Sequence, residues 1–205
     1  MMSRPLGWNP ELLPPRAWAF IQMYLPGQSE RFVGGEAALA GFWFHHRQVD
    51  RVEVVLTSQE ALDRLQSEVT SQPRQVLPGF IRYEEVDLMV DHAHVLETSK
   101  PMENGIQADS LEDLAADRLL RLASGAQVSL LVDLYFLERY RVDLLAAAKG
   151  AASKDLGLTP SALAVQLARS RPTRLPEGLL RPVELPDLLS FLESLIERFG
   201  MQVRL

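Results

Sequence analysis

The segment from Arg31 to Leu56 constrains the fold most, because it joins a pair of glycines, an apolar helical pattern and an alternating strand pattern. Gly34 and Gly35 follow a short apolar stretch, and residues 36–46 then carry apolar side chains at helical spacing. A glycine turn that opens a helix leaves backbone N–H groups exposed, and such groups can bind a phosphate. The same turn can instead serve close packing of the helix. Because a pair of glycines alone is a weak motif, the glycines by themselves favour the packing interpretation.

Two later segments with alternating apolar side chains predict strands. In residues 50–57 the alternation places Arg51 and Glu53 on one face. In residues 80–91 it places Asp87 on the face opposite to the valine and leucine side chains. If these two strands lie together, Glu53 and Asp87 converge beside the glycine turn.

The remaining segments are mostly helical in pattern, and residues 100–108 are expected to be a connector. We therefore expect an α+β protein with a sheet-bearing half in residues 1–100 and a helical half in residues 101–205, together forming one compact unit. Apolar spacing, capping residues and prolines predict helices over residues 16–25, 59–70, 109–122, 128–139, 142–153, 160–168 and 186–199.

The composition narrows the class of protein. With 205 residues, of which 47% are hydrophobic, the chain can bury one substantial core. A formal net charge of -6 argues against a general nucleic-acid-binding surface. The absence of cysteine excludes disulfides and thiolate metal sites. No run of residues is long and apolar enough for a membrane span or a signal core, so we expect a cytoplasmic protein with no membrane partner.

The order of these parts resembles the nucleotidyltransferase fold, and in particular the AbiEii-type toxin family. That family reads approximately GG(S/T)ALA, a helix, HRxSxD-hydrophobic-D, a later strand with a third aspartate, LxDLxxxK and RDxxDLY. The resemblance implies a nucleotidyltransferase-like mixed sheet with flanking helices, followed by a helical half, with a nucleotide held between the halves. The matching segments of this chain are residues 34–40, 46–54, 85–90, 110–120 and 128–137.

The resemblance also assigns site residues, and the metal-binding positions depart from the family. Glu53 and Asp87 match two of the metal-binding carboxylates, but Arg51 stands where the first carboxylate should be. A fixed positive charge about 4 Å from a divalent cation is repelled by roughly 8 kcal/mol at an effective dielectric constant of about 20. Asp50 could replace the missing carboxylate only through a bulge, because strand alternation puts it opposite to Glu53. The positions matched to nucleotide binding are Gly34, Gly35, Arg47 and Arg118.

Three further departures concern the phosphate-binding and helical motifs. Glu36 replaces the small hydroxyl residue after the glycines, and its charge repels a triphosphate. Ser129 and Leu130 replace the arginine and aspartate of the last motif. Together with Arg51, these changes predict a degenerate site. We further expect Arg51 to form an ion pair with Glu53 or Asp87.

The sequence therefore favours a pseudoenzyme that binds a protein partner, or binds a nucleotide without transferring it, and that needs no metal or other cofactor. The alternative is an active toxin of a toxin–antitoxin pair, a nucleotidyltransferase that uses Mg²⁺ and a nucleoside triphosphate to modify RNA or protein. Nucleic acid is expected only as a substrate of that alternative. A third possibility is a structural subunit whose cleft is filled by its own side chains.

Overall fold

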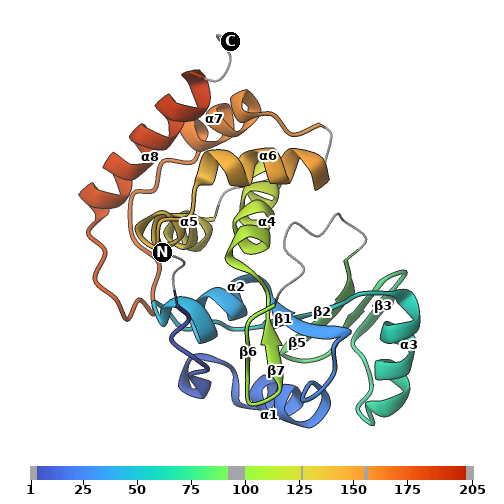
Figure 1. Ribbon diagram of the computed structural model, residues 1–205. Coiled ribbons are helices and arrows are strands. Elements are labelled where there is room, and N and C mark those ends of the chain that lie inside the picture. Colours follow the sequence, from blue (N-terminus) through green and yellow to red (C-terminus); the bar gives the residue numbers. More distant parts are fainter. Residues whose placement is uncertain (1–3, 92–99, 126, 155–156, 202–205) are drawn as a thin grey trace. The chain divides into compact units, whose positions relative to one another are not determined.

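The computed structural model describes residues 4–91, 100–125, 127–154 and 157–201. These residues fall into two compact units (Figure 1). Residues 4–91 and 100–110 form a sheet unit, and residues 111–201 form a helical unit. The predicted α+β class, a mixed sheet with flanking helices followed by a helical part, is confirmed.

The sheet unit is organised around one mixed sheet of seven described strands, in the order β3-β4-β5-β2-β1-β7-β6. The β2–β5 and β1–β7 pairs are parallel, and the other neighbouring pairs are antiparallel. The strands are β1 (Arg31–Gly34), β2 (Val52–Leu56), β3 (Gln75–Leu77), β4 (Phe80–Arg82), β5 (Val86–Val90), β6 (Met102–Glu103) and β7 (Ile106–Ala108).

The register of β2 and β5 decides where the two candidate carboxylates lie. In this parallel pair Glu53 is the direct partner of Asp87. Directly opposite residues on neighbouring strands project to the same face of a sheet. The predicted convergence of Glu53 and Asp87 on one face is therefore confirmed.

The prediction of one strand over residues 80–91 is wrong. The chain reverses between β4 and β5, which pair antiparallel, and the Tyr83 N–H donates to the Val86 carbonyl at 2.8 Å across the turn. Tyr83 in this turn is buried, with 5% of its surface exposed. The buried positions change phase here, from Ile81 and Tyr83 to Val86 and Leu88. That phase change is the sequence signal of the reversal.

The prediction of a connector over residues 100–108 is also wrong. Strands β6 and β7 form a hairpin here, and β7 extends the sheet by pairing with β1. Asn104 and Gly105 lie in the turn with φ values of 54° and 77°. Two positive φ values are what a tight hairpin turn requires, and Asn-Gly is the dipeptide that most readily adopts them. This dipeptide is the sequence signal of the hairpin.

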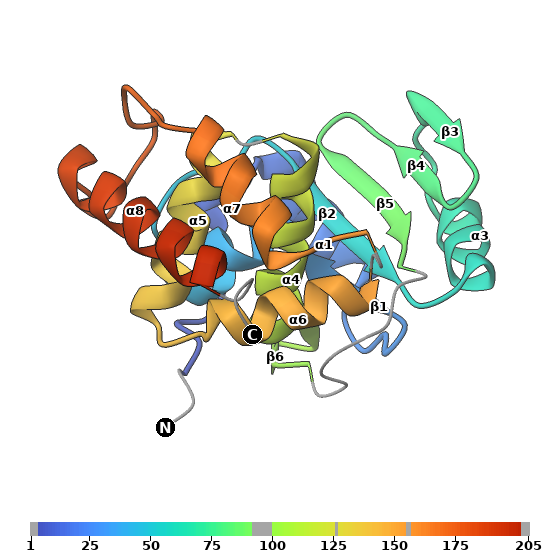
Figure 2. The ribbon, with the colours of Figure 1, turned by 90° about the horizontal axis from the view of Figure 1, so that it is seen from above.

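Helices cover the sheet unit close to their predicted positions. Helix α1 (Pro15–Tyr24) follows a short 3-10 turn, η1 (Pro10–Leu12), and α3 (Gln59–Glu68) lies alongside β5 (Figure 2). Ser58 caps the start of α3, because its Oγ accepts a hydrogen bond from the Ala61 N–H at 3.1 Å. The helix expected over residues 36–46 consists of α2 (Gly35–Ala38) and a π-helix, η2 (Leu39–Phe44), whose six residues are all buried.

The helical unit contains five described helices, each within two residues of its predicted ends. Helix α4 packs against three of the others, and α8 packs against α5 and α7. In the described part of the chain no helix is long and apolar enough to cross a membrane. The helices are α4 (Leu111–Ser124), α5 (Val128–Arg139), α6 (Leu144–Lys154), α7 (Pro160–Arg169) and α8 (Leu185–Met201) (Figure 1).

Candidate functional site

The two glycines at the end of β1 each have a structural reason to be glycine. Gly34 is extended, and a Cβ atom added there would lie 2.7 Å from Val55 Cγ2 on β2. Gly35, the first residue of α2, has φ of 58°, in the left-handed region that side chains disfavour. Close strand packing and a left-handed turn therefore account for the pair without a bound phosphate.

Alanine at either glycine should destabilise the sheet unit. We expect Gly34→Ala to cost about 1–3 kcal/mol through overpacking against buried Val55. Gly35→Ala should cost about 1–2 kcal/mol through backbone strain. Urea unfolding at fixed pH measures both changes. Gly200→Ala in α8 is the matched control, because its added Cβ meets open space and should be neutral or slightly stabilising. Losses no larger than the control would show that the turn tolerates side chains.

Arg47, matched to nucleotide binding, holds a carboxylate from its own chain. Its Nη2 donates to Glu36 Oε2 at 2.7 Å, and its Nη1 donates to the Gln48 carbonyl at 3.2 Å. The Arg47 side chain is 6% exposed, whereas that of Glu36 is 31% exposed. The glutamate that departs from the family pattern thus neutralises the arginine that follows it.

Asp87 is held by two arginines, and the predicted ion pair with Arg51 is confirmed. Arg51 Nη2 donates to Oδ1 at 2.6 Å, and its Nε donates to Oδ2 at 3.3 Å. Arg82, on the neighbouring strand β4, donates from Nε to Oδ1 at 2.8 Å and from Nη2 to Oδ2 at 3.0 Å. Each carboxylate oxygen offers about two acceptor positions. Both positions of both oxygens are therefore taken by guanidinium groups.

Arg82 was not among the predicted site residues, because its approach to Asp87 depends on the unpredicted reversal between β4 and β5. In the hairpin, Arg82 becomes the direct cross-strand partner of Asp87. Within one continuous strand the two residues would be five positions apart and could not meet.

Arg51 also has a structural role beyond its ion pair. Its Nη1 donates to the Glu84 carbonyl at 2.8 Å, and its Nη2 donates to the Tyr83 carbonyl at 3.2 Å. The guanidinium thus ties the start of β2 to the turn between β4 and β5. Arg51 thus gives two backbone carbonyls of this turn a hydrogen-bond donor.

The balance of burial and charge keeps Asp87 ionised. Burial raises the pKa of its carboxyl group, but the hydrogen bonds and charges of Arg82 and Arg51 lower it by more. The resulting pKa lies below the ordinary value of 3.8. The negative charge is thus stabilised by protein cations.

The other carboxylates near β2 do not complete a metal site. Glu53 lies next to Asp87 and is partly exposed, whereas Asp50 lies in an exposed bend before β2. The register of β2 with β5 is continuous from residue 52 to 56, so no bulge in this ladder brings Asp50 to the Glu53 face. Across the residues that the structure describes, no group of three or more acidic or histidine side chains is arranged to hold a metal ion.

The polar residues matched in the helical unit are buried between helices. Arg118 on α4 has a 4% exposed side chain, and its Nη1 lies 3.6 Å from Oδ2 of the fully buried Asp133 on α5. Lys154 at the end of α6, which the sequence analysis did not single out, is 1% exposed. Its Nζ lies 3.2 Å from Asp113 Oδ1 and 2.7 Å from Asp117 Oδ1 on α4. These ion pairs connect α4 with α5 and α6.

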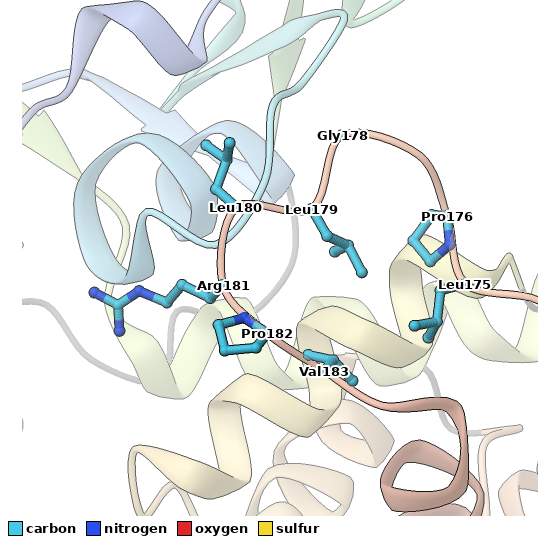
Figure 3. Close-up of a pocket in the computed structure, with 8 residues that line it drawn as sticks. All are labelled: Leu175, Pro176, Gly178, Leu179, Leu180, Arg181, Pro182 and Val183. Carbon is cyan, nitrogen blue, oxygen red and sulfur yellow. The ribbon is translucent and has the colours of Figure 1, made fainter.

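An open pocket in the helical unit is formed by the loop between α7 and α8 (Figure 3). Leu175 and Leu179 point to the inside of the loop, while Arg181 points away from it. Arg181 Nη1 donates to the Tyr140 hydroxyl at 2.9 Å. The lining contains no carboxylate or imidazole, so it offers no metal ligand or acid–base group. The lining residues are Leu175, Pro176, Gly178, Leu179, Leu180, Arg181, Pro182 and Val183.

No protein-family model and no curated protein sequence matches the chain. Solved structures with a similar fold are found. The structure of a provisionally assigned nucleotidyltransferase from H. pylori is 14% identical, with a TM-score of 0.52, and the match covers 94% of this chain and 98% of that one. The chain has a nucleotidyltransferase-like fold.

A second similar structure is that of JHP933 from Helicobacter pylori, with 14% identity and a TM-score of 0.49 over 94% of this chain and 97% of that one. At this level of identity a structural match shows the fold alone. The predicted nucleotidyltransferase fold is confirmed in this sense, and the AbiEii-type family assignment stays a prediction.

Proposed function

We propose that this protein is a degenerate member of the AbiEii-type toxin family that has lost nucleotide transfer and acts by binding another protein in the cytoplasm. The observation that carries the proposal is the state of Asp87, whose two oxygens are both occupied by Arg51 and Arg82. The chain itself supplies the positive charge that a metal ion supplies in an active transferase.

Nucleotidyl transfer requires that carboxylates hold metal ions, which bridge the phosphates and stabilise the in-line displacement. Divalent ions of this kind need oxygen ligands and an excess of negative charge. Here the charges of Arg51 and Arg82 cancel those of Glu53 and Asp87. A metal ion would have to displace a bidentate guanidinium from Asp87 and would still lie beside two cations. We therefore propose that this site needs no metal or other cofactor.

The alternative is an active nucleotidyltransferase toxin that modifies RNA or protein with Mg²⁺ and a nucleoside triphosphate. It draws support from the register that sets Glu53 directly beside Asp87. Under this alternative Arg51, whose side chain is 34% exposed, would swing away to admit the metal. The hydrogen bonds of Arg51 to two backbone carbonyls weigh against that movement.

Nucleotide transfer by the purified protein tests the proposal. We expect no transfer from any labelled nucleoside triphosphate to RNA or protein, with Mg²⁺ or Mn²⁺ present. The Arg51→Asp variant should bind the metal more tightly than the parent, because a third carboxylate replaces a cation. Transfer should stay undetectable, because Glu36 still occupies Arg47 and Leu130 still replaces an acidic residue. Glu36→Thr, Ser129→Arg and Leu130→Asp would be needed as well.

Arg64→Asp is the matched control, because Arg64 pairs with Glu30 on the exposed surface, away from Asp87. It should change neither metal binding nor transfer. Clear turnover by the parent, or by Arg51→Asp alone, would overturn the proposal and establish the active alternative. Stabilisation of the parent by a nucleoside triphosphate without turnover would favour nucleotide binding as the retained activity.

A further inference from the structure

Four arginines of the helical unit, near the loop between α7 and α8, have no carboxylate partner. Other exposed arginines form ion pairs, for example Arg64 with Glu30 and Arg171 with Glu193. In the part of the chain that the structure describes, these four form no ion pair. We call them the arginine corner, which consists of Arg139, Arg141, Arg174 and Arg181.

The arginine corner adjoins the open pocket of the helical unit. Arg181 lines the pocket, and its Nη1 donates to the Tyr140 hydroxyl at 2.9 Å. Tyr140 follows α5, and Arg139 and Arg141 stand on either side of it in the chain, both exposed. Arg174 is exposed and immediately precedes the first lining residue. The charges therefore lie at the end of α5 and at both ends of the lining segment.

The hydrogen bonds of these arginines leave their charge uncompensated. Arg139 Nη1 donates to the Tyr135 hydroxyl at 2.9 Å, as Arg181 does to Tyr140. A phenol hydroxyl accepts an N–H bond but carries no charge that could neutralise the guanidinium. A guanidinium has further N–H donors in a planar fork that matches a carboxylate. The corner can therefore bind carboxylates from outside the chain.

The acidic side chains nearby do not cancel this charge. Glu138 is paired with Arg198, and Asp143 accepts hydrogen bonds from two backbone N–H groups at the start of α6. Glu177 and Glu184 are exposed in the loop, and within the described residues neither forms an ion pair with the corner. Two loop glutamates against four arginines leave a local excess of positive charge, although the whole chain has a net charge of -6. Such an excess attracts an acidic ligand.

The pocket beside the corner is apolar. Its volume is about 560 Å³, which suits a small molecule or a few side chains of a peptide. Leu175 and Leu179 point to its inside, whereas Arg181 points away, so the charge lies beside the apolar space and not within it (Figure 3). Leu180, which also lines the pocket, is 54% exposed. An apolar side chain that entered the pocket would cover these leucines.

We propose that the arginine corner and the adjoining pocket together bind an acidic segment of a partner protein that carries a bulky apolar side chain. The apolar side chain enters the pocket, and the flanking carboxylates bind the arginines. A peptide suits this surface better than RNA does, because bases stack on aromatic rings and the pocket offers aliphatic side chains and prolines. The inference rests on the proposed function, and it names the chemistry of the partner.

Fluorescence anisotropy with a labelled peptide of glutamates around a central leucine, at physiological salt, tests this inference. The parent should bind the peptide, and Arg139→Ser/Arg141→Ser should weaken binding by about tenfold or more, because charge-assisted hydrogen bonds are lost. Leu179→Ala should weaken it by about fivefold, because the central leucine loses an apolar contact. Arg64→Ser is the matched control, since Arg64 is an exposed arginine of the sheet unit, and should leave binding unchanged.

Two further peptides separate the apolar contact from the charges. A peptide with serine in place of the central leucine should bind the parent about fivefold more weakly. It should also bind the parent and Leu179→Ala equally, because it has no side chain for the pocket. A peptide with lysines in place of the glutamates should not bind, because like charges repel.

Thermal unfolding of each variant verifies that it is folded. If Leu179→Ala lowers the Tm strongly, Leu180→Ser replaces it, because Leu180 lines the same pocket and is exposed. The proposal is wrong if the parent does not bind the glutamate–leucine peptide, or if the arginine variant binds it as tightly as the parent. It is also wrong if a single-stranded oligoribonucleotide binds the corner and the peptide does not.

Failure of this inference can be told apart from failure of the proposed function. Nucleotide transfer by the parent is measured without the peptide, and its detection would overturn the proposed function while peptide binding could still be observed. Absence of peptide binding would overturn this inference and leave the proposed loss of transfer standing.

Discussion

Asp87→Ala should lower the free energy of unfolding of the sheet unit by about 2–3 kcal/mol. The variant removes the shared partner of two arginines and the hydrogen bonds that fill both carboxylate oxygens. The loss is smaller than for a fully buried charge, because the Arg51 and Arg82 side chains are 34% and 42% exposed and water takes up part of their hydrogen bonding. Chemical denaturation at neutral pH measures it.

The same ion pair makes stability depend on pH. The pKa of Asp87 is lower in the folded protein than its ordinary value of 3.8, so the unfolded chain binds a proton more tightly. Asp87 therefore contributes fully to the free energy of unfolding above the ordinary pKa of 3.8. This contribution is lost as the pH falls through the pKa of the folded state. Asp87→Asn, which keeps the shape but not the charge, should show less loss of stability in this acid range than the parent.

Asp63→Ala is the control for both measurements. Asp63 is exposed on α3, and its carboxylate accepts a hydrogen bond from the exposed Gln59 side chain. Its effect should stay below about 0.5 kcal/mol. An Asp87→Ala variant as stable as this control would show that the ion pairs of Asp87 with Arg51 and Arg82 do not stabilise the sheet unit.

Asp133→Ala should have the largest effect on stability, about 3–5 kcal/mol in the helical unit. Asp133 is fully buried, and the variant would leave the 4% exposed Arg118 side chain without the carboxylate 3.6 Å from its Nη1. Unfolding followed by circular dichroism in urea measures the change. Asp133 and Arg118 lie in segments that resemble motifs of a nucleotide-binding family. The measurement therefore tests whether the pair stabilises the helical unit.

A double-mutant cycle separates that structural role from a functional one. Asp133→Leu combined with Arg118→Met replaces the ion pair with apolar side chains of similar size, which often restores or exceeds the original stability. We expect the double variant to be clearly more stable than either single variant. A neutral Asp133→Ala change would instead mean that stability does not explain this buried aspartate.

In both halves of the candidate site, protein side chains neutralise the charged group that would hold a ligand. On the metal side, arginines occupy a carboxylate, and on the phosphate side a glutamate occupies an arginine. Each substitution supplies a charge that a metal ion or a phosphate would otherwise supply. A site whose charges are satisfied by its own side chains keeps the fold stable without a ligand, as the proposed function requires.

The sequence by itself determined the features that depend on neighbours along the chain. Helices were placed within two residues because apolar spacing and caps are local signals, as Ser58 and Thr159 show by accepting hydrogen bonds from Ala61 and Ala162. Strand alternation was enough to put Glu53 and Asp87 on one face, since side chains alternate with a period of two. It also placed Arg51 on the face of both carboxylates, and the structure shows that Asp87 is its partner.

Only the tertiary structure decided which distant charges meet. The reversal after β4 brought Arg82 to Asp87, and the chain path after η2 brought Arg47 to Glu36. The packing of α6 on α4 brought Lys154 to Asp113. Arginine and lysine side chains are long and can reach many positions, so the partner of each is set by the three-dimensional path of the backbone and by the burial that forbids an unpaired charge.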